Sequence, residues 1–267
     1  MKTYLSQLFS LALGVCACGA SAASLPTISC SQQEPLECTS SNGAWGVVTS
    51  TVQDADGDGL MLVWSVNGLV AHTAVIAAGV ASNAVTLSFT NQFAAGTNEV
   101  VVTVTDDGTN MVSCSSMVVV QDTTPPVIRS IIATPNVLWP PNHRMVPVRL
   151  AVRAHDACGP VRWHIDSITS NETEDALGSG HTAPDYLIRG PHQALLRAER
   201  SGRGSGRIYT LTVVVSDESG NSSTGTVKVL VPHDHRRGWD WPADNAGDQP
   251  GNNGKSKSKS KGNGHRP

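Results

Sequence analysis

Short segments in which apolar and polar residues alternate recur along most of this chain, and turn-forming residues separate them. In residues 99–105, for example, Val100, Val102 and Val104 share one side of the segment. A period of two residues is the pattern of a β-strand. Clusters such as residues 56–59 and the pair Asn67-Gly68 are typical of the turns between strands. The sequence therefore predicts an all-β protein.

Counting these segments gives a more specific fold class. We expect twelve strands, at 46–52, 60–66, 84–90, 99–105, 111–120, 127–134, 146–154, 161–169, 186–189, 194–199, 208–216 and 224–231. The last seven occupy about 105 residues, which is typical of an immunoglobulin-like sandwich. Trp64 lies in the middle of an apolar strand, where the core of a sandwich would use it. We predict two tandem immunoglobulin-like β-sandwiches.

Breaks in the pattern set the expected domain boundaries. The Thr-Thr-Pro-Pro segment at 123–126 predicts a stiff linker, because proline cannot donate to a strand ladder. The two sandwiches are therefore expected at 24–122 and 127–233. Residues 234–267 show no apolar periodicity and end in alternating Lys and Ser, which predicts a disordered basic tail.

The first 23 residues have the pattern of a secretory signal peptide. Lys2 precedes an apolar run over 5–17, and Ala20-Ser21-Ala22 supplies small residues for cleavage. This predicts a secreted protein, or one of the cell envelope. Lipid attachment at Cys16 or Cys18 is the alternative, although neither lies in a good lipobox. No later segment is long and apolar enough to predict a transmembrane helix.

Four cysteines remain after removal of the expected signal peptide: Cys30, Cys38, Cys114 and Cys158. An even number in an oxidising compartment predicts disulfides, and four cysteines allow three pairings. Their spacing does not match a structural zinc site.

Charge is distributed unevenly along the chain. Residues 24–126 contain nine carboxylates and no Lys or Arg, whereas residues 127–267 carry a net positive charge. This arrangement suits cation binding by residues 24–126 and electrostatic contact of the basic tail with anionic surfaces. The alternative is that the carboxylates of residues 24–126 only form a soluble acidic surface.

Five of these carboxylates are candidate calcium ligands. Asp54, Asp56 and Asp58 alternate along one turn, and in a sandwich that turn would lie at the same end as Asp106 and Asp107. Carboxylate oxygens are the ligands that calcium prefers, and an extracellular site of this kind would be weak. The twelfth position from Asp54 is a serine, which excludes an EF-hand. The alternative is that these residues are ordinary turn formers.

Several motifs of the first half resemble bacterial extracellular repeats. Residues 37–40, 54–60 and 63–65 resemble the polycystic-kidney-disease (PKD) type of immunoglobulin-like repeat. Residues 102–106, Cys114, residues 118–120 and residues 122–128 resemble the closing strand and junction of hyalin-repeat (HYR) modules.

The second half resembles an immunoglobulin-like module that often follows such repeats in exported bacterial proteins. Its marks are LWPPNH at 138–143, SITSNE at 167–172, TAPD at 182–185, LRAERSG at 196–202, SDESGNS at 216–222 and VPHD at 231–234. The resemblance implies an extracellular, non-catalytic accessory module. Against that pattern Cys158 lacks an obvious partner, so it would pair with Cys30 or stay a free thiol. We favour the pairing of Cys38 with Cys114, because the first and last strands of a sandwich can lie side by side.

Other candidate sites have plainer alternatives. His143, His233 and His235 could share a metal ion, but surface histidines are commoner. Trp139 could offer a ring to a sugar, or cover the core. Charged residues flank a Gly-rich turn and predict either an anion site or an exposed hairpin face: Arg197, Glu199, Arg200, Arg203 and Arg207.

The function expected from these observations is adhesion, spacing or recognition by a secreted or cell-surface protein, stiffened by calcium. No catalytic motif with adequate spacing is present, so we expect no enzyme. Basic residues do not alternate with aromatic ones on a shared strand, which argues against nucleic-acid binding. The expected partner is a cell-surface, matrix or glycan ligand. The alternatives are a module that binds carbohydrate or metal, and a hydrolase with an unrecognised site.

Overall fold

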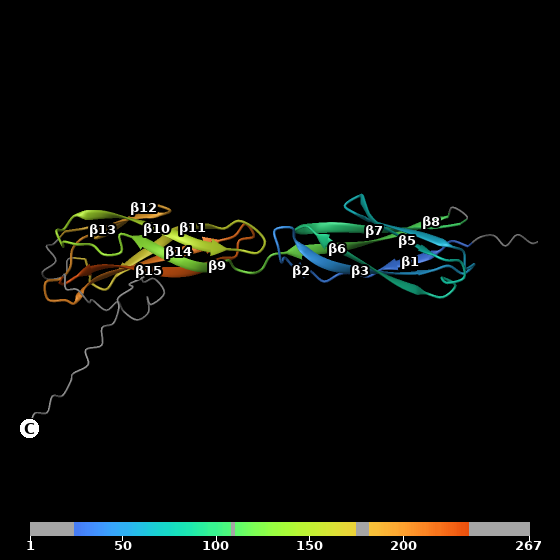
Figure 1. The fold of residues 1–267 in the computed structure, drawn as a ribbon, viewed down its shortest axis with the longest axis horizontal. Helices are drawn as coiled ribbons and strands as arrows, with labels where there is room; N and C mark the ends of the chain where they lie inside the picture. Colours follow the sequence, from blue (N-terminus) through green and yellow to red (C-terminus); the bar gives the residue numbers. More distant parts are fainter. Residues whose placement is uncertain (1–23, 108–109, 175–181, 235–267) are drawn as a thin grey trace, which may run out of the picture. The chain divides into compact units, whose positions relative to one another are not determined.

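The computed structural model describes residues 24–107, 110–174 and 182–234, coloured in Figure 1. The expected signal peptide, and the expected tail beyond Asp234, lie outside the described residues. Within the described part the chain forms fifteen strands and no helix, so the prediction of an all-β fold is confirmed. Contacts divide the chain into two units. Unit 1 holds the described residues up to Pro35 and Trp45–Val119, and unit 2 holds Leu36–Ala44 and the described residues from Val120 onward.

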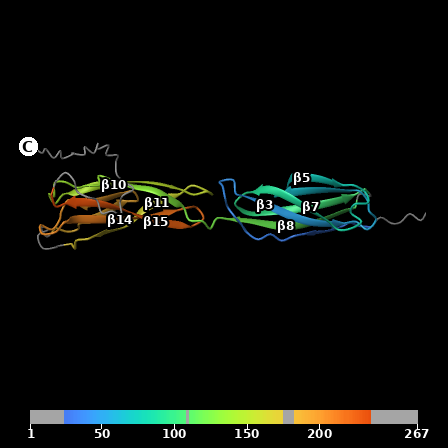
Figure 2. The ribbon, with the colours of Figure 1, turned by 60° about the horizontal axis from the view of Figure 1, so that its bottom comes forward.

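Two sheets enclose the core of unit 1. One has the order β1-β3-β6, and the other has the order β2-β8-β7-β4-β5. The strands are β1 (Thr27–Cys30), β2 (Leu36–Glu37), β3 (Ala44–Gln53), β4 (Leu60–Val66), β5 (Leu69–Ile76), β6 (Val85–Phe93), β7 (Gly96–Asp106) and β8 (Met111–Gln121). Strand β2 runs parallel to the end of β8, where Leu36 pairs with Val120 in unit 2. Figure 2 shows the layered strands in blue and green.

The alternation in the sequence explains how these sheets close. On β3 the residues Val48 and Val52 are buried, whereas Trp45 and Val47, which precede them at odd-numbered positions, are exposed. Trp64 on β4 is 1% exposed and its ring lies 6.1 Å from that of Phe89 on β6, so it joins the two sheets as expected. Such aromatic pairs contribute beyond the area they bury.

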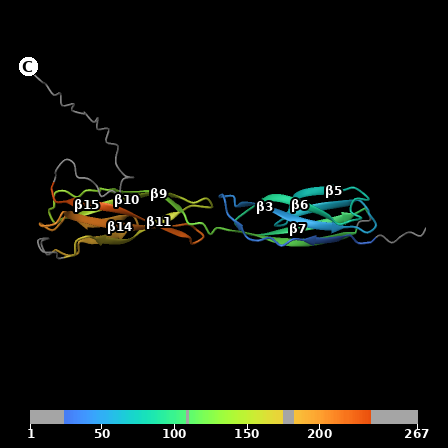
Figure 3. The same ribbon diagram turned by 90° about the horizontal axis from the view of Figure 1, so that it is seen from below.

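In the described part of unit 2, strands β9 to β15 form a sandwich. Its sheets have the orders β12-β13-β10-β9 and β11-β14-β15. The strands are β9 (Val127–Thr134), β10 (Met145–His155), β11 (Arg162–Ser170), β12 (Tyr186–Gly190), β13 (Gln193–Arg197), β14 (Gly206–Ser216) and β15 (Ser222–Pro232). With the strands lettered A to G, these orders are DEBA and CFG, the topology of a constant-type immunoglobulin domain. The predicted pair of immunoglobulin-like sandwiches is confirmed, and Figure 3 shows each from another side.

A tyrosine near the start of the sixth strand reinforces this assignment. Tyr209 on β14 is fully buried, and its hydroxyl donates to the backbone oxygen of Arg197 at 2.9 Å. A tyrosine in this position that bonds back to an earlier segment is a hallmark of immunoglobulin-like sandwiches. The main core of unit 2 surrounds it and includes Leu196 and Leu211.

Three strands were absent from the sequence-based expectation, namely β1, β2 and β5. Strands β1 and β2 are only 4 and 2 residues long, too short to show a period. Strand β5 is an edge strand, and most of its residues are exposed on both faces. It follows Asn67 and Gly68, whose φ angles of 51° and 81° form the expected tight turn.

The structure corrects the expected disulfide pairing. Cys30 is bonded to Cys114, with 5.8 Å between their Cα atoms, and Cys38 is bonded to Cys158, with 5.9 Å between theirs. Pairing of Cys38 with Cys114 is excluded because Cys38 donates its backbone N–H to Gln121. Gln121 lies seven residues beyond Cys114 along β8, or about 23 Å.

Candidate functional site

The structure brings the five predicted calcium ligands to one end of unit 1. Asp54, Asp56 and Asp58 lie between β3 and β4, whereas Asp106 and Asp107 lie at the end of β7. The two segments meet where Gly59 donates its N–H to Oδ2 of Asp107 at 3.2 Å. Burial raises the pKa of Asp58, and the four neighbouring carboxylates raise it further. We call this set the acidic end.

Two members of the acidic end are held by turn geometry. The buried Asp54 accepts a hydrogen bond at Oδ1 from the N–H of Asp56 at 2.9 Å. Asp106 is also buried and accepts two bonds from Asn110, both of 2.7 Å, from the backbone N–H and from Nδ2. Bonds that a carboxylate accepts from the backbone N–H groups following it favour turns. These two residues therefore have structural roles.

Unit 2 repeats both turns. Asp156, which follows β10, accepts a bond from the N–H of Cys158 at 2.8 Å. Asp217 accepts bonds from the N–H and Nδ2 of Asn221, at 2.9 and 3.0 Å. The equivalents of Asp54 and Asp106 are thus present in unit 2, where Glu218 follows Asp217 as Asp107 follows Asp106. Asp56 and Asp58, whose places in unit 2 are taken by Cys158 and Pro160, are the charges that distinguish the acidic end of unit 1.

The acidic end has one feature that turn formation does not explain. Oδ2 of Asp54 is buried and has no hydrogen-bond partner, which is costly for a charged group. Asp56 accepts a bond from the N–H of Ser24 through its own Oδ2. Among the described residues, no three of the five carboxylates bring oxygens within 4.8 Å of one another. The residue types fit calcium, but their oxygens are not gathered into a preformed ligand set.

A pocket of about 420 Å³ opens beside the acidic end. Leu60, Met61 and Val75 line it together with Asp106 and Asp107. Val75 is 79% exposed. The pocket is therefore a shallow, largely apolar surface that also contains two carboxylates.

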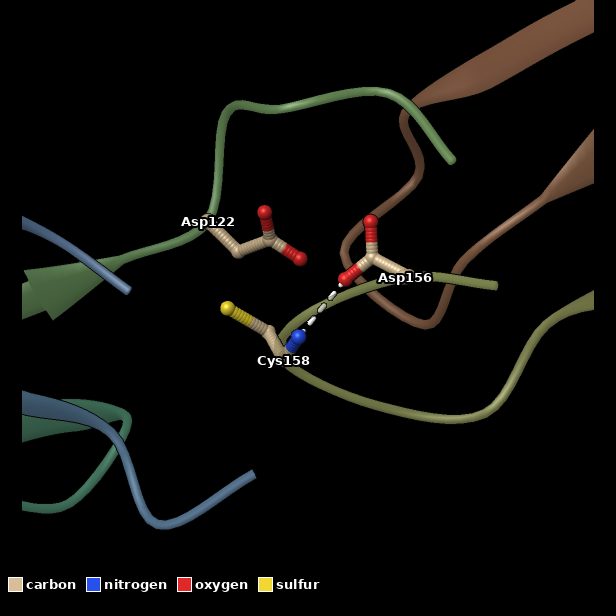
Figure 4. Close-up of side chains that lie close together, drawn as sticks. All are labelled: Asp122, Asp156 and Cys158. Atoms are coloured by element: carbon tan, nitrogen blue, oxygen red, sulfur yellow. Dashed lines mark hydrogen bonds between the residues drawn. The ribbon is translucent and has the colours of Figure 1, made fainter. Parts of the chain in front are cut away.

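Three potential metal-binding groups do come together in unit 2. Asp122, Asp156 and Cys158 bring one ligand atom each within 4.8 Å of the others, as Figure 4 shows. The sulfur of Cys158 is bonded to Cys38, so it is not the thiolate that a metal requires. Asp122 accepts bonds from Ser219 at Oδ2 and from Thr124 at Oδ1. We interpret this cluster as part of the turn structure around the disulfide.

The motifs of the second half converge on a buried ionic network in unit 2. Arg207 on β14 is fully buried and forms ion pairs with Asp185 and with Glu172, the latter at 3.3 Å. Its Nη1 also donates to the hydroxyl of Tyr209 at 3.2 Å. Burial raises the pKa of Asp185 even though Arg207 favours its ionised form. Burial likewise raises the pKa of Tyr209 to about 12.

A second carboxylate lies close to this network. Glu199 is fully buried and accepts bonds at Oε2 from Thr182 and from Nδ1 of His143, the latter at 2.9 Å. Burial alone would raise the pKa of Glu199, but the bonds from Thr182 and His143 outweigh it and the pKa is lowered. His143 itself has a φ of 62°, a conformation that non-glycine residues seldom adopt.

This network corrects one expectation and qualifies another. The residues around the Gly-rich turn are not all on an exposed hairpin face, because Glu199 and Arg207 are fully buried. His143 contacts Glu199, whereas His233 contacts the carbonyl of Gly202 at 3.2 Å. His235 lies outside the described residues. Trp139 is 43% exposed, so it only partly covers the core.

Comparison with known proteins gives similarity of fold only. No family model and no curated protein matches the chain. Fibronectin(III)-like modules of Clostridium thermocellum CbhA match at 15% identity and a TM-score of 0.28, over 37% of this chain and all of theirs. The Yersinia pseudotuberculosis adhesin InvE matches at 15% identity and a TM-score of 0.34, over 76% of this chain and 58% of its own. A Bacteroides ovatus glucan-utilisation protein, SGBP-B, was solved with a heptasaccharide. It matches at 14% identity and a TM-score of 0.26, over 77% of this chain and 47% of its own.

Proposed function

We propose that this protein is an extracellular, non-catalytic recognition protein whose two sandwiches present binding surfaces for adhesion or spacing. The observation that carries the proposal is how its charged side chains are used. Asp54 and Asp106 of the acidic end accept bonds within turns, and Asp185 and Glu172 of the buried network form ion pairs with Arg207. Exposed apolar side chains, in contrast, lie on the outer faces of the sheets, including Trp45 and Met111.

The two disulfides support an oxidising location for the protein. Cys30–Cys114 and Cys38–Cys158 close loops of 84 and 120 residues, and disulfides persist outside the reducing cytosol. No helix in the described part of the chain is long and apolar enough to cross a membrane. Export through residues 1–23 is part of the proposal.

Calcium stiffening is a further part of the proposal and rests on Asp54. A cation at the acidic end would neutralise the buried Oδ2 of Asp54. It would also relieve the repulsion from neighbouring carboxylates, which adds to burial in raising the pKa of Asp58. Asp54, Asp56, Asp58, Asp106 and Asp107 supply the oxygens, after a rearrangement that gathers them. Such a rearrangement costs free energy, so the affinity would be low, about 10⁻⁴–10⁻³ M.

Binding to intact cells and to extracellular matrix tests the proposed role. Purified, fluorescently labelled full-length protein, with its disulfides intact, is added to cells and matrix with calcium or with EDTA. We expect saturable binding that reduction of the disulfides abolishes. A hydrolase screen with ester, glycoside and peptide substrates is run in parallel. Release of product from any of them would contradict the non-catalytic assignment. Absence of saturable binding to every surface would contradict the recognition role.

A further inference from the structure

The outer face of the β1-β3-β6 sheet of unit 1 carries an exposed indole on a surface without charge. Trp45 is 66% exposed and Val47, two residues along β3, is 48% exposed. Gly46 between them and Val48 after them are buried, so the alternation of β3 places Trp45 and Val47 on the same outer face. Trp45 and Val47 are therefore neighbouring exposed apolar side chains on one sheet face, and contiguous apolar surface of this kind marks interaction sites.

Hydroxyl groups continue this face along β3. Thr49 and Thr51 follow Val47 at alternate positions, and Ser29 of β1 pairs with Thr51. The hydroxyls of Thr51 and Thr86 lie 3.0 Å apart, and those of Ser31 and Thr49 lie 2.8 Å apart. Each hydroxyl has one donor and two acceptor sites, so these groups keep capacity for a ligand after bonding one another. The strip from Trp45 to Thr51 is about 20 Å long.

The absence of charge on this face indicates which class of ligand it could bind. The outward positions of β1, β3 and β6 are Trp, Val, Ser, Thr and Gln, without a single charged residue. Residues 24–126 also lack Lys and Arg and contain nine carboxylates, so an anionic polymer would be repelled. A cationic partner would be drawn to the acidic end instead. An uncharged ligand with both C–H faces and hydroxyls matches the strip.

We propose that this face binds a neutral polysaccharide, with a pyranose ring stacked on Trp45 and its hydroxyls bonded to the Ser and Thr row. The indole offers a flat, polarisable surface for the C–H face of a sugar, and it loses little side-chain entropy on binding. The Thr and Ser hydroxyls replace the water that the sugar hydroxyls give up. This assignment rests on the proposed recognition role and names the chemical class of its ligand.

Affinity electrophoresis and pull-down with defined polysaccharides test the assignment. The probes are neutral hydroxyethylcellulose, xylan, mixed-linkage glucan and insoluble chitin, with the anionic alginate for comparison. We expect at least one neutral probe, but not alginate, to retain the full-length protein. Trp45→Ala should weaken that binding about tenfold or more, and Trp45→Phe should weaken it less because a ring remains. Val75→Ala, which removes an exposed apolar group from the other sheet, is the matched control and should bind normally.

Several outcomes would overturn the assignment. They are normal binding by Trp45→Ala, failure of every neutral probe, and stronger retention by alginate. Light scattering in solution tests the other occupant of this face: a dimer that Trp45→Ala converts to a monomer would assign the face to a second copy of the chain. Equal melting temperatures for the variants establish that each is folded. Saturable binding to cells that Trp45→Ala leaves intact would overturn this inference while leaving the recognition role in place.

Discussion

Nδ1 of His143 lies 2.9 Å from Oε2 of Glu199, and this bond joins a half-exposed side chain to a fully buried one. The imidazole is 52% exposed, whereas the carboxylate is inaccessible to solvent and receives its other bond from Thr182. The buried charge therefore depends on two donors for its stabilisation. One of them, His143, comes from the LWPPNH motif, and Glu199 comes from LRAERSG.

Removing the imidazole should destabilise unit 2 measurably. His143→Ala leaves Glu199 buried with Thr182 as its remaining donor, and we expect a loss of about 1–3 kcal/mol in the free energy of unfolding at pH 7. Urea denaturation of the full-length protein, followed by tryptophan fluorescence, measures it. His233→Ala, whose imidazole is 37% exposed and contacts a loop carbonyl, is the control and should change little. Equal stabilities for the two variants would contradict the role assigned to His143.

The lowered pKa of Glu199 predicts a pH dependence of definite sign. Folding holds this carboxyl ionised below its ordinary pKa of 4.5, so its contribution is present above that pH and is lost as the pH falls through the folded-state pKa. The stability difference between wild type and Glu199→Gln should therefore be larger at pH 7 than at pH 3. Urea melts of both proteins at a series of pH values measure it. A difference that stays constant with pH would show that the charge of Glu199 is not what folding uses.

The ion pair of Arg207 with Asp185 predicts a larger effect. Arg207→Met removes the buried cation that pairs with Asp185 and Glu172, so that Asp185 keeps only Arg197, whose Nε lies 3.6 Å from its Oδ1; breaking a buried pair typically costs about 3–5 kcal/mol. Arg207→Lys should recover only part of this, because an ammonium cannot reproduce the planar fork of a guanidinium. Arg203→Ala, at an exposed position, is the matched control for loss of a positive charge. Calorimetric unfolding of the three variants measures the effect, and equal stabilities of Arg207→Met and Arg203→Ala would contradict it.

The sequence predicted the strands that bury one face, and the physical reason is their period. Strand β7 alternates over its length, and every second side chain from Val100 to Val104 is fully buried. Strand β5 could not be predicted in this way, because exposure of both faces at the sheet edge removes the alternation. The all-β class therefore followed from the sequence, but the complete sheets did not.

The buried network could not be predicted because its members are distant in sequence and polar in type. Glu172, Asp185 and Arg207 lie in three separate segments, and only the sandwich topology brings them together. Charged residues beside a Gly-rich turn are usually exposed, and periodicity carries no signal for a buried ion pair. The grouping of the five carboxylates of the acidic end was easier to predict, because sandwich topology places the loops after β3 and β7 at one end. Which of them are turn acceptors became visible only from their hydrogen bonds.

A disulfide from Cys158 to a cysteine of residues 24–129 predicts a peptide map. Trypsin has no site between residues 24 and 128, so Cys30, Cys38 and Cys114 stay in one large peptide that ends at Arg129. Cys158 falls in the peptide 154–162. We expect the unreduced digest to contain these two peptides joined and reduction to release 154–162, detected by mass spectrometry. Release of 154–162 without reduction would show that Cys158 is not bonded to Cys38.

Calcium should stabilise unit 1 if the acidic end binds it. Adding calcium to several millimolar should raise the melting temperature of the full-length protein, and Asp54→Asn should abolish the response. Asp58→Asn has two opposite effects: because the pKa of Asp58 is raised, its charge disfavours folding as the pH rises, so this variant should melt higher than wild type in EDTA. With calcium present it should gain less than wild type. Asp217→Asn, which alters the matching turn of unit 2, should keep the full response to calcium. A melting temperature that calcium leaves unchanged would assign the acidic end to turn formation alone.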